Sequence, residues 1–514
     1  MNHAASEHEN LGIVLDREAR VPLYRQIEAT IRAQIASGEL TIGERLPPER
    51  KLAGLLGVDR TTVIAAYREL AADGILMAHV GRGTVVAARH SGFDPDGTHG
   101  TPAGGVAWDS LLAMRDEDDP ILAEVSALAG RPDVISFAGG VPAPESYPVE
   151  AFRNLLVEAF EAGGASLLQY SPPEGLSSLR RVLAERMESR GMPVRPAGII
   201  ACAGSQQGLY LLARALIAPD DAVVVETPTY LGALQVFRAV GARIIAIPAD
   251  RAGMDVERLG DLLRRRTVKL IYVLPTFQNP TGSTMPLARR ERLVALARRH
   301  GVAVIEDDPY GEIRYGGQHV PSLLELDHAP GSPVIYLSTF SKVLFPGFRL
   351  GWVAAPVPVV ERLAWVKALV DLDTNPLVQW AVGEYVCRGR LDEHIGALRG
   401  LYLQRRDRMV ESLERHLGNS LSFRPPDGGF YVWARFTNGP RARDVLTDAA
   451  SRGVAFVPGD VFHADGGGRE TMRLAFSAVD LDEIDEGVSR LASAAGAAGQ
   501  RRAEQRRGRS TRIV

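Results

Sequence analysis

The chain has 514 residues, of which 46% are hydrophobic and 24% charged, and its formal net charge is −3. This length indicates more than one domain, and the composition is typical of a globular protein with a large core. Two cysteines without CxxC or Cys/His spacing exclude a disulfide framework and a structural zinc site, and no metal site is expected. The net charge excludes a globally basic chain but is compatible with a local basic patch.

The N-terminus predicts neither secretion nor membrane insertion. It reads MNHAASEHENLG, which is polar and has no apolar run behind a basic start. No uninterrupted apolar segment of the sequence is long enough to span a bilayer. We therefore expect a cytoplasmic protein with no membrane partner.

Three short helices are predicted near the N-terminus. Apolar residues recur at every fourth position from Leu23 to Ile35, which indicates an amphipathic helix. Two further helices are expected over residues 49–56 and 60–72, with a turn at Gly57 between them. Two short helices joined by a glycine turn are typical of a helix-turn-helix.

A hairpin is predicted next, because residues 80–86 (VGRGTVV) alternate around a glycine tip. Together with GERLPPERKLAGLLGVDRTTVIAAYRELAADGIL, this stretch resembles the winged-helix domain of GntR-type bacterial regulators, over residues 11–88. The resemblance implies that double-stranded operator DNA is a partner. Each arginine could instead lie on a solvated helix face or pair with Glu49, Asp59 or Glu69. The residues that the resemblance places toward DNA are Arg50, Arg60, Thr62, Arg82 and Gly83.

Two segments are predicted to lack a packed structure. Residues 89–107 are rich in glycine, proline and small polar residues without a hydrophobic period, which predicts a flexible linker. Residues 496–514 are rich in arginine and poor in apolar residues, which predicts a basic disordered tail. A solvated tail is favoured, and a weak, salt-sensitive contact with DNA is the alternative.

The remainder of the chain, residues 108–495, alternates helical runs with short apolar strands. This alternation predicts an α/β domain with a mainly parallel sheet, whose ligands gather at the carboxyl ends of the strands. The clearest predicted strands cover residues 222–225, 244–247, 270–274, 303–305 and 334–337.

One motif within this domain, STFSKVLFPGFRLG at residues 338–351, predicts a covalent cofactor site. A lysine forms a Schiff base through its neutral amine, and the apolar residues that follow Lys342 favour this form by lowering its pKa. Thr339, Ser341 and Arg349 supply the hydroxyl and guanidinium donors that a phosphate monoester requires. An aldehyde that carries such a phosphate is pyridoxal phosphate (PLP). The alternative is a plain lysine at a strand-to-loop junction.

Polar and aromatic residues follow several other predicted strands. Ser205 lies in AGSQQG at the start of a helix, where free backbone amides bind an anion, although a simple N-cap explains it nearly as well. Tyr230 is placed to stack on a planar heterocycle or to pack in the core. Asn279 in QNPTG can hydrogen-bond a phenolate oxygen, although NPTG is also a good turn sequence.

Three more residues complete the predicted site. Asp307, in EDDPY, is placed to keep a pyridine nitrogen protonated, and Tyr310 would join Asn279 on the ring oxygen. Arg473 lies inside the apolar strand MRLAF, where an unpaired guanidinium is costly. Its expected partner is a ligand carboxylate, and the alternative is a buried pair with Asp or Glu.

In this order, these motifs resemble the fold-type I PLP enzymes of the aminotransferase class I and II family, over residues 108–495. The resemblance implies a large domain with a mainly parallel sheet and a smaller α+β domain. It places Gly140 and Arg473 on the amino-acid side of the site. Tyr170 resembles the tyrosine that reaches the phosphate of a neighbouring subunit, which implies a homodimer. The implied cofactor-binding residues are Ser205, Gln206, Tyr230, Asn279, Asp307, Tyr310, Thr339, Ser341, Lys342, Arg349 and Tyr170.

A GntR-type winged helix joined to an aminotransferase-like body resembles the MocR group of bacterial regulators. This resemblance implies a PLP-dependent transcription regulator that senses PLP, an amine or an amino acid. An active aminotransferase is the alternative, with Lys342 as the base that moves an amino group from an amino acid to a 2-oxo acid. A third alternative, an inert dimerisation scaffold, is disfavoured because the residues that the chemistry needs are present.

Overall fold

The computed structural model describes residues 11–17, 19, 21–41, 43–72, 75–79, 83–86, 120–437 and 439–510. The chain divides into two compact units, Met1–Arg115 and Asp116–Val514. The predicted linker, residues 89–107, and Arg82 at the predicted wing tip lie outside the described residues. Within the described parts of the chain, no helix is long and apolar enough to cross a membrane.

The described residues of the first unit form three helices and a hairpin, as the sequence predicts. Ile27, Ile31, Val63 and Leu70 are fully buried, so the predicted apolar faces of the first and third helices form its core. Gly57 ends the second helix in the left-handed conformation, with φ of 62°, which allows the tight turn before the third. The two strands pair antiparallel. The elements are α1 (Leu23–Ser37), α2 (Glu49–Leu56), α3 (Arg60–Ala72), β1 (Leu76–His79) and β2 (Gly83–Val86).

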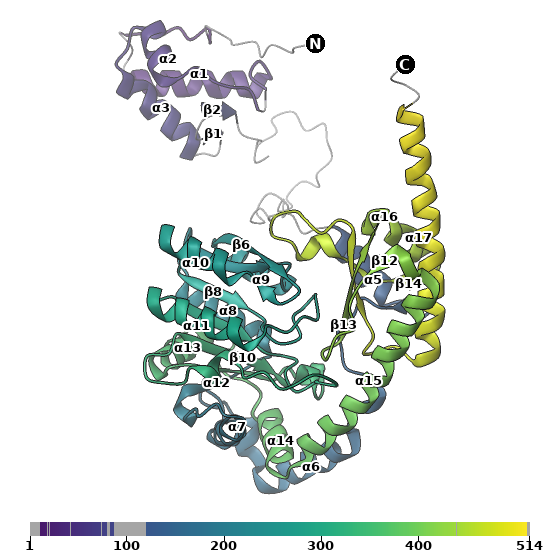
Figure 1. Ribbon diagram of the computed structural model, residues 1–514. Coiled ribbons are helices and arrows are strands. Elements are labelled where there is room, and N and C mark those ends of the chain that lie inside the picture. The colour runs from purple at the N-terminus through teal and green to yellow at the C-terminus, as the bar shows by residue number, and fades with distance from the viewer. Residues whose placement is uncertain are drawn as a thin grey trace. The chain divides into compact units, whose positions relative to one another are not determined.

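The second unit is built on an eight-stranded sheet, which contains all five strands predicted above (Figure 1). Five neighbouring strands run parallel, and β11 runs antiparallel to them between β10 and β4. In spatial order the strands are β4 (Ile199–Cys202), β11 (Gly351–Ala354), β10 (Val334–Thr339), β9 (Ala303–Asp307), β8 (Leu270–Val273), β5 (Ala222–Thr227), β6 (Arg243–Asp250) and β7 (Gly253–Met254).

Helices cover both faces of this sheet, which explains why its central strands are apolar without alternation. Val223 and Val225 pack into the core on one face, whereas Val224 between them packs into the core on the other. One face is covered by α8 (Ser205–Leu216), α9 (Leu231–Ala239) and α13 (Val357–Ala368). The other is covered by α7 (Ser177–Ser189), α10 (Val256–Arg265), α11 (Leu287–His300), α12 (Leu323–Leu326) and α14 (Pro376–Cys387).

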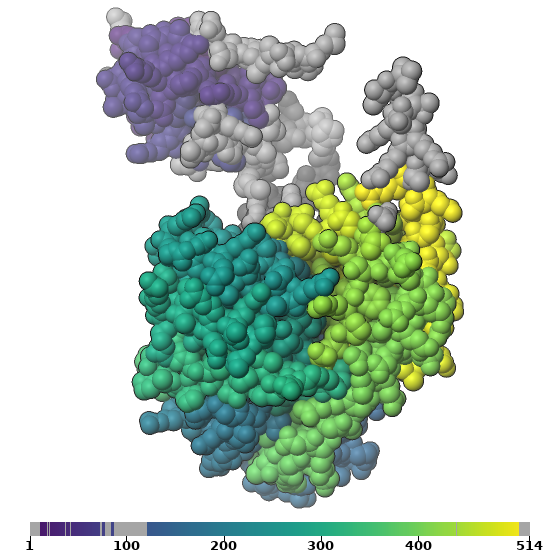
Figure 2. Space-filling view, in the orientation of Figure 1, coloured from purple at the N-terminus to yellow at the C-terminus, as the bar shows by residue number. Residues whose placement is uncertain are grey.

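A smaller α+β part completes the second unit. The long helix α15 (Arg390–Leu417) leads into it, and Figure 2 shows its green and yellow surface meeting the teal surface of the large sheet part. Its four-stranded sheet is antiparallel. The strands are β12 (Leu421–Ser422), β13 (Tyr431–Phe436), β16 (Thr471–Ala475) and β15 (Val457–Pro458), and β14 (Val454–Ala455) pairs separately with β3 (Ile135–Ser136). The helices α5 (Pro120–Ala129), α6 (Val149–Ala162), α16 (Ala442–Ser451) and α17 (Leu481–Ser510) belong to the same unit.

The prediction of a disordered tail from residue 496 is wrong for the part that the structure describes. Helix α17 continues through this segment to Ser510, and residues 511–514 lie outside the described residues. Ala498 is still buried, Arg501 pairs with Asp448, and Arg502 donates to the carbonyl of Gly439. These contacts with α16 and the loop before it stabilise a stretch whose polar composition suggested disorder.

Candidate functional site

A pocket of about 270 Å³ opens in the second unit. Asp307 ends β9 and Thr339 ends β10, and the antiparallel β11 begins beside Thr339, which brings Arg349 to the same edge of the sheet. The pocket brings together most of the residues predicted from the sequence: Gly140, Ser205, Gln206, Tyr230, Asn279, Asp307, Tyr310, Thr339, Ser341, Lys342, Arg349 and Arg473.

Tyr170 does not line this pocket. It follows the short helix η2 (Gly164–Leu168), and 79% of its surface is exposed within the single chain. Its predicted role requires a second subunit, so its position outside the pocket is compatible with that prediction.

Lys342 lies in the short helix η4 (Phe340–Lys342), directly after β10, and its amine faces the pocket. Its Nζ donates a hydrogen bond of 2.7 Å to the carbonyl of Gly140. Loss of water around the amine lowers the pKa of Lys342, as the sequence predicts, and so favours the neutral nucleophile. Gly140 must be small, because an added Cβ would collide with the hydroxyl of Tyr431.

The donors for an anion converge beside Lys342. Ser205 is the first residue of α8, so its hydroxyl and the free backbone amides of that helix N-terminus lie together. Thr339 Oγ1 donates to Ser341 Oγ at 3.0 Å. Arg349 has φ of 48°, and its Nη2 donates to the carbonyl of Ala203 at 3.2 Å, next to the start of α8. This donor set fits a phosphate group.

Asp307 has one satisfied carboxylate oxygen and one without a partner. Oδ2 accepts a hydrogen bond of 2.6 Å from the hydroxyl of Tyr272, whereas the buried Oδ1 has no partner among the described residues. Burial raises the pKa of Asp307 to about 7. An unpartnered carboxylate oxygen in a pocket fits a protonated ring nitrogen.

The predicted ring contacts line the same pocket. The hydroxyl of Tyr230 donates to Gln206 Oε1 at 3.0 Å. Asn279 Oδ1 accepts a hydrogen bond of 2.9 Å from Arg473 Nη1, so the NH₂ of Asn279 is the group left to donate to a ring oxygen. The hydroxyl of Tyr310 lies 2.8 Å from that of Tyr431.

Arg473 is 8% exposed and makes no hydrogen bond to a carboxylate in the described parts of the chain. Its second hydrogen bond, from Nη2, goes to the carbonyl of Ala138, and its Nε has no partner there. The guanidinium carbon lies 4.3 Å from the ring centroid of Tyr431 and 5.0 Å from that of Phe462. The alternative of a buried pair with Asp or Glu is therefore excluded for these residues, and a ligand carboxylate fits the N–H donors that remain on Nε and on the two Nη atoms.

Tyr431 is a site residue that the sequence analysis missed. It begins β13 and lines the pocket together with Leu274 and Pro309. The analysis searched the ends of predicted parallel strands, whereas Tyr431 enters from the smaller sheet. The preceding Gly428-Gly429 pair was an available signal, because an added Cβ at Gly428 would collide with Phe277 and the carbonyl of Ile313.

The predicted DNA-facing residues lie on the first unit. Arg50 is exposed on α2, and Thr62 is partly buried on α3. Arg60 is exposed but donates to Glu49 at 2.9 Å, which is one of the alternatives considered for it. Gly83 begins β2. The contacts of these residues with DNA stay predictions.

Residues 132–491 match the family described as aminotransferase class I and II. The chain belongs to this family. Residues 23–86 match the bacterial regulatory proteins of the gntR family, so a GntR-type DNA-binding domain is fused to an aminotransferase domain.

Relatives of both kinds are similar to this chain. Aromatic-amino-acid aminotransferase 1 of Thermococcus litoralis is 42% identical, over 72% of this chain and 89% of the relative. The probable rhizopine catabolism regulatory protein MocR of Rhizobium meliloti is 32% identical, over 94% of this chain and 95% of the relative. The α-aminoadipate aminotransferase LysN of Thermus thermophilus, solved with N-(5'-phosphopyridoxyl)-L-leucine, has a TM-score of 0.70 and 34% identity, over 76% of this chain and 99% of that one. The aminotransferase domain is PLP-dependent, and the two-domain chain is of the MocR-like regulator type.

Proposed function

We propose that the aminotransferase domain of this regulator serves as a sensor, which binds PLP together with an amine or an amino acid and thereby changes how the chain binds operator DNA. The observation that carries the proposal is the presence, in one chain, of a gntR-family domain and a pocket that retains the predicted cofactor residues. A ligand shifts a DNA-competent state only as far as it prefers one arrangement of the protein.

In this proposal different pocket residues hold different parts of the cofactor. Lys342 holds it covalently, and Asp307 pairs with the ring nitrogen. Asn279 and Tyr310 donate to the ring oxygen, and Tyr230 stacks on the ring. When bound, the cofactor supplies an electrophilic carbon and an electron-withdrawing ring. The phosphate is held by Ser205, Gln206, Thr339, Ser341 and Arg349.

The amino-acid side is assigned to Arg473 and Gly140. Arg473 has an unpartnered buried Nε and is held over two aromatic rings, so it is oriented to bind a carboxylate. Gly140 leaves room for the ligand beside the amine of Lys342. A ligand carboxylate on Arg473, which lies in β16 of the smaller part, would draw that part toward the large sheet part.

A homodimer is part of the proposal. Leu168 is 64% exposed, Tyr170 79% and Leu369 70% within the single chain, so these side chains are accessible to a second copy. A second copy that covers this surface would bring its Tyr170 toward the phosphate end of the first pocket. A regulator that binds operator DNA as a dimer would act in the cytoplasm.

The test of the cofactor site is reduction of the PLP-loaded protein with borohydride followed by peptide mapping. The adduct should lie on Lys342 and be absent from the Lys342→Ala variant. The peptide that contains Lys367 is a matched control, because this lysine is also buried but pairs with Asp371. An adduct on another lysine, or none after PLP is added, contradicts the proposal.

An active aminotransferase remains the second candidate, favoured by the 42% identity to the Thermococcus litoralis enzyme and by the retained pocket residues. The two candidate functions predict different rates of amino-group transfer. The regulator proposal predicts slow transfer between amino acids and 2-oxo acids, together with altered promoter control in Lys342→Ala. Fast multiple turnover by the wild type, combined with normal promoter control in that variant, would favour the enzyme.

A further inference from the structure

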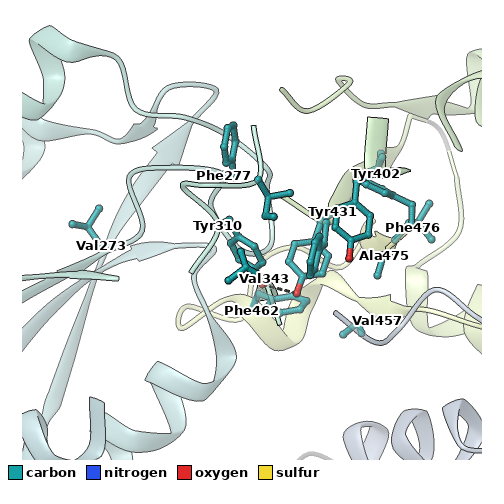
Figure 3. Packing of buried hydrophobic residues seen from close by; sticks show 14 of the residues in the cluster. Val273, Phe277, Tyr310, Val343, Tyr402, Tyr431, Val457, Phe462, Ala475 and Phe476 are labelled. Atoms are coloured by element: carbon teal, nitrogen blue, oxygen red, sulfur yellow. Dashed lines mark hydrogen bonds between the residues drawn. The ribbon is translucent and has the colours of Figure 1, made fainter. Parts of the chain in front are cut away.

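The hydroxyl of Tyr431 lies at the junction of the two parts of the second unit. Figure 3 shows its ring, carried by β13, pointing at Tyr310 of the large sheet part, with a dashed hydrogen bond between the two hydroxyls. Both side chains are buried, and their ring centroids are 5.7 Å apart at an angle of 83°. The same hydroxyl also lies against Gly140, whose carbonyl accepts from Lys342. Tyr431 therefore touches the cofactor pocket from the smaller part.

The direction of this hydrogen bond follows from the role proposed for Tyr310. A phenol has one proton to donate, and its oxygen accepts. If Tyr310 gives its proton to the ring oxygen of the cofactor, its own oxygen is left as an acceptor 2.8 Å from Tyr431. Tyr431 must then be the donor, which makes a chain of two hydrogen bonds toward the ring oxygen.

The surrounding charges favour the same direction. Burial acts to raise the pKa of Tyr431, but the positive charge of Arg473 acts against this, and the pKa of Tyr431 lies below its ordinary value. Burial raises the pKa of Tyr310 well above its ordinary value. The more acidic phenol is the better donor, so Tyr431 donates and Tyr310 accepts. Across the pocket, Tyr230 and Asp307 are the other titratable groups that face this pair.

We propose that Tyr431 is a positioning residue that donates a hydrogen bond to Tyr310 and thereby strengthens the donation of Tyr310 to the cofactor's ring oxygen. The inference rests on the proposed function, which assigns Tyr310 to that oxygen. Stronger donation removes negative charge from the ring oxygen, and this charge otherwise stabilises the proton on the nitrogen that joins the cofactor to Lys342. With PLP bound, Tyr431 would therefore lower the pKa of that nitrogen.

The experiment is a pH titration of the visible absorbance of the full chain loaded with PLP. Tyr431→Phe should raise the midpoint by about 0.5–1 pH unit, the size expected for one lost hydrogen bond. Tyr310→Phe should raise it further. The double variant should match Tyr310→Phe alone, because Tyr431 acts through Tyr310.

Tyr402→Phe is the matched control. Tyr402 is also buried and its ring lies 5.0 Å from that of Phe430, but its hydroxyl accepts from the backbone of Ala143 and does not line the pocket. The midpoint of the pH titration of Tyr402→Phe should equal that of the wild type. Borohydride trapping of each variant on Lys342 shows that the cofactor site is still formed, so that a shift reports on the hydroxyl alone.

Four results would overturn the inference. An unchanged or lowered midpoint in Tyr431→Phe, with a raised one in Tyr310→Phe, rejects the donor role of Tyr431 and leaves the proposed function standing. A double variant that shifts by the sum of the two singles shows that Tyr431 acts independently of Tyr310. A wild-type chain without lysine-bound PLP, or Tyr310→Phe without any shift, rejects the proposed assignment and this inference with it.

Discussion

At the scale of single residues, the pocket is marked by buried polar atoms that the fold leaves without partners. Asp307 Oδ1 and Arg473 Nε are both buried and unpartnered among the described residues. Unpartnered buried polar groups are costly, and a ligand in the pocket can supply the missing partner. One is an acceptor and the other a donor, which matches a protonated ring nitrogen and a carboxylate.

We expect the cofactor-free protein to lose stability as the pH rises, and Asp307→Asn to lose less. Burial raises the pKa of Asp307 to about 7, above its value in the unfolded chain, so its stabilising proton is lost as the pH rises through about 7. Between pH 5.5 and 8.5 the free energy of unfolding should fall by about 2 kcal/mol more in the wild type than in Asp307→Asn, at roughly 1.4 kcal/mol per pKa unit. Urea unfolding at both pH values measures it.

Glu226 and Glu306 also have pKa values raised by burial to about 7, so part of the pH dependence should remain in the variant. Loading the wild type with PLP should reduce the dependence, because a protonated ring nitrogen stabilises the charged Asp307. If Asp307→Asn loses stability as steeply as the cofactor-free wild type, the unpartnered oxygen has no energetic consequence.

Arg473→Lys should weaken the binding of amino acids but not the binding of simple amines. A lysine keeps the charge but loses the planar fork that binds a carboxylate through two hydrogen bonds. Amino acids should then bind about 10- to 100-fold more weakly, at roughly 1.5–3 kcal/mol for a charged hydrogen bond. Amines without a carboxylate should bind as before. Spectral titration of the PLP-loaded protein measures the affinity for each kind of ligand. An equal loss of affinity for amino acids and amines would show that Arg473 only supports the pocket.

At the scale of elements, the turn between α2 and α3 depends on the backbone of a single glycine. Gly57→Ala should destabilise these helices by roughly 1–2 kcal/mol, because Gly57 has φ of 62° and an added Cβ would lie 3.3 Å from Arg17 Nη2. Hydrogen exchange of the amides in residues 49–72 of the full chain measures this change.

Gly54→Ala is the matched control within the same helix. Gly54 lies in the interior of α2, has no atom within 4 Å of an added Cβ and has no left-handed backbone, so alanine should stabilise the helix by about 0.5–1 kcal/mol. We therefore expect Gly57→Ala to destabilise the motif and Gly54→Ala to stabilise it. Equal effects would show that the turn conformation does not decide the stability of this motif.

At the scale of the whole molecule, the two units are expected to contribute separable functions. Arg50→Ala should weaken operator binding by roughly 1–3 kcal/mol if Arg50 contacts a base edge, and it should leave the PLP absorbance unchanged. Arg25→Ala is a control, because Arg25 is an exposed arginine on α1 that pairs with Glu28. Binding titrations over a range of salt concentrations measure both variants. Wild-type binding by Arg50→Ala would place the DNA-binding face elsewhere.

Regulation, in contrast, should depend on both units together. We expect Lys342→Ala to change the response of a target promoter to amines more than it changes the affinity for operator DNA, because the ligand acts by shifting the protein between states. Reporter assays and binding titrations on the same operator compare the two effects. A variant that responds normally without the lysine contradicts the sensor role.

The sequence by itself determined the elements and the identity of most pocket residues. The bounds of α2 and α3 and the five parallel strands follow from local periodicity and glycine turns. The pocket residues follow from side-chain chemistry at strand ends and from the resemblance to aminotransferases. These features are short-range, because helix periods, caps and strand ends involve residues a few positions apart.

The tertiary structure alone decided the contacts between distant segments. Tyr310 and Tyr431 are separated by 121 positions, and Asn279 and Arg473 by 194, so no local spacing predicts either pair. The contacts of Arg501 and Arg502 in α17 likewise involve Asp448 and Gly439, which lie on other segments. Which buried oxygen or nitrogen is left without a partner is decided in the same way, since it depends on every group that the fold brings around it.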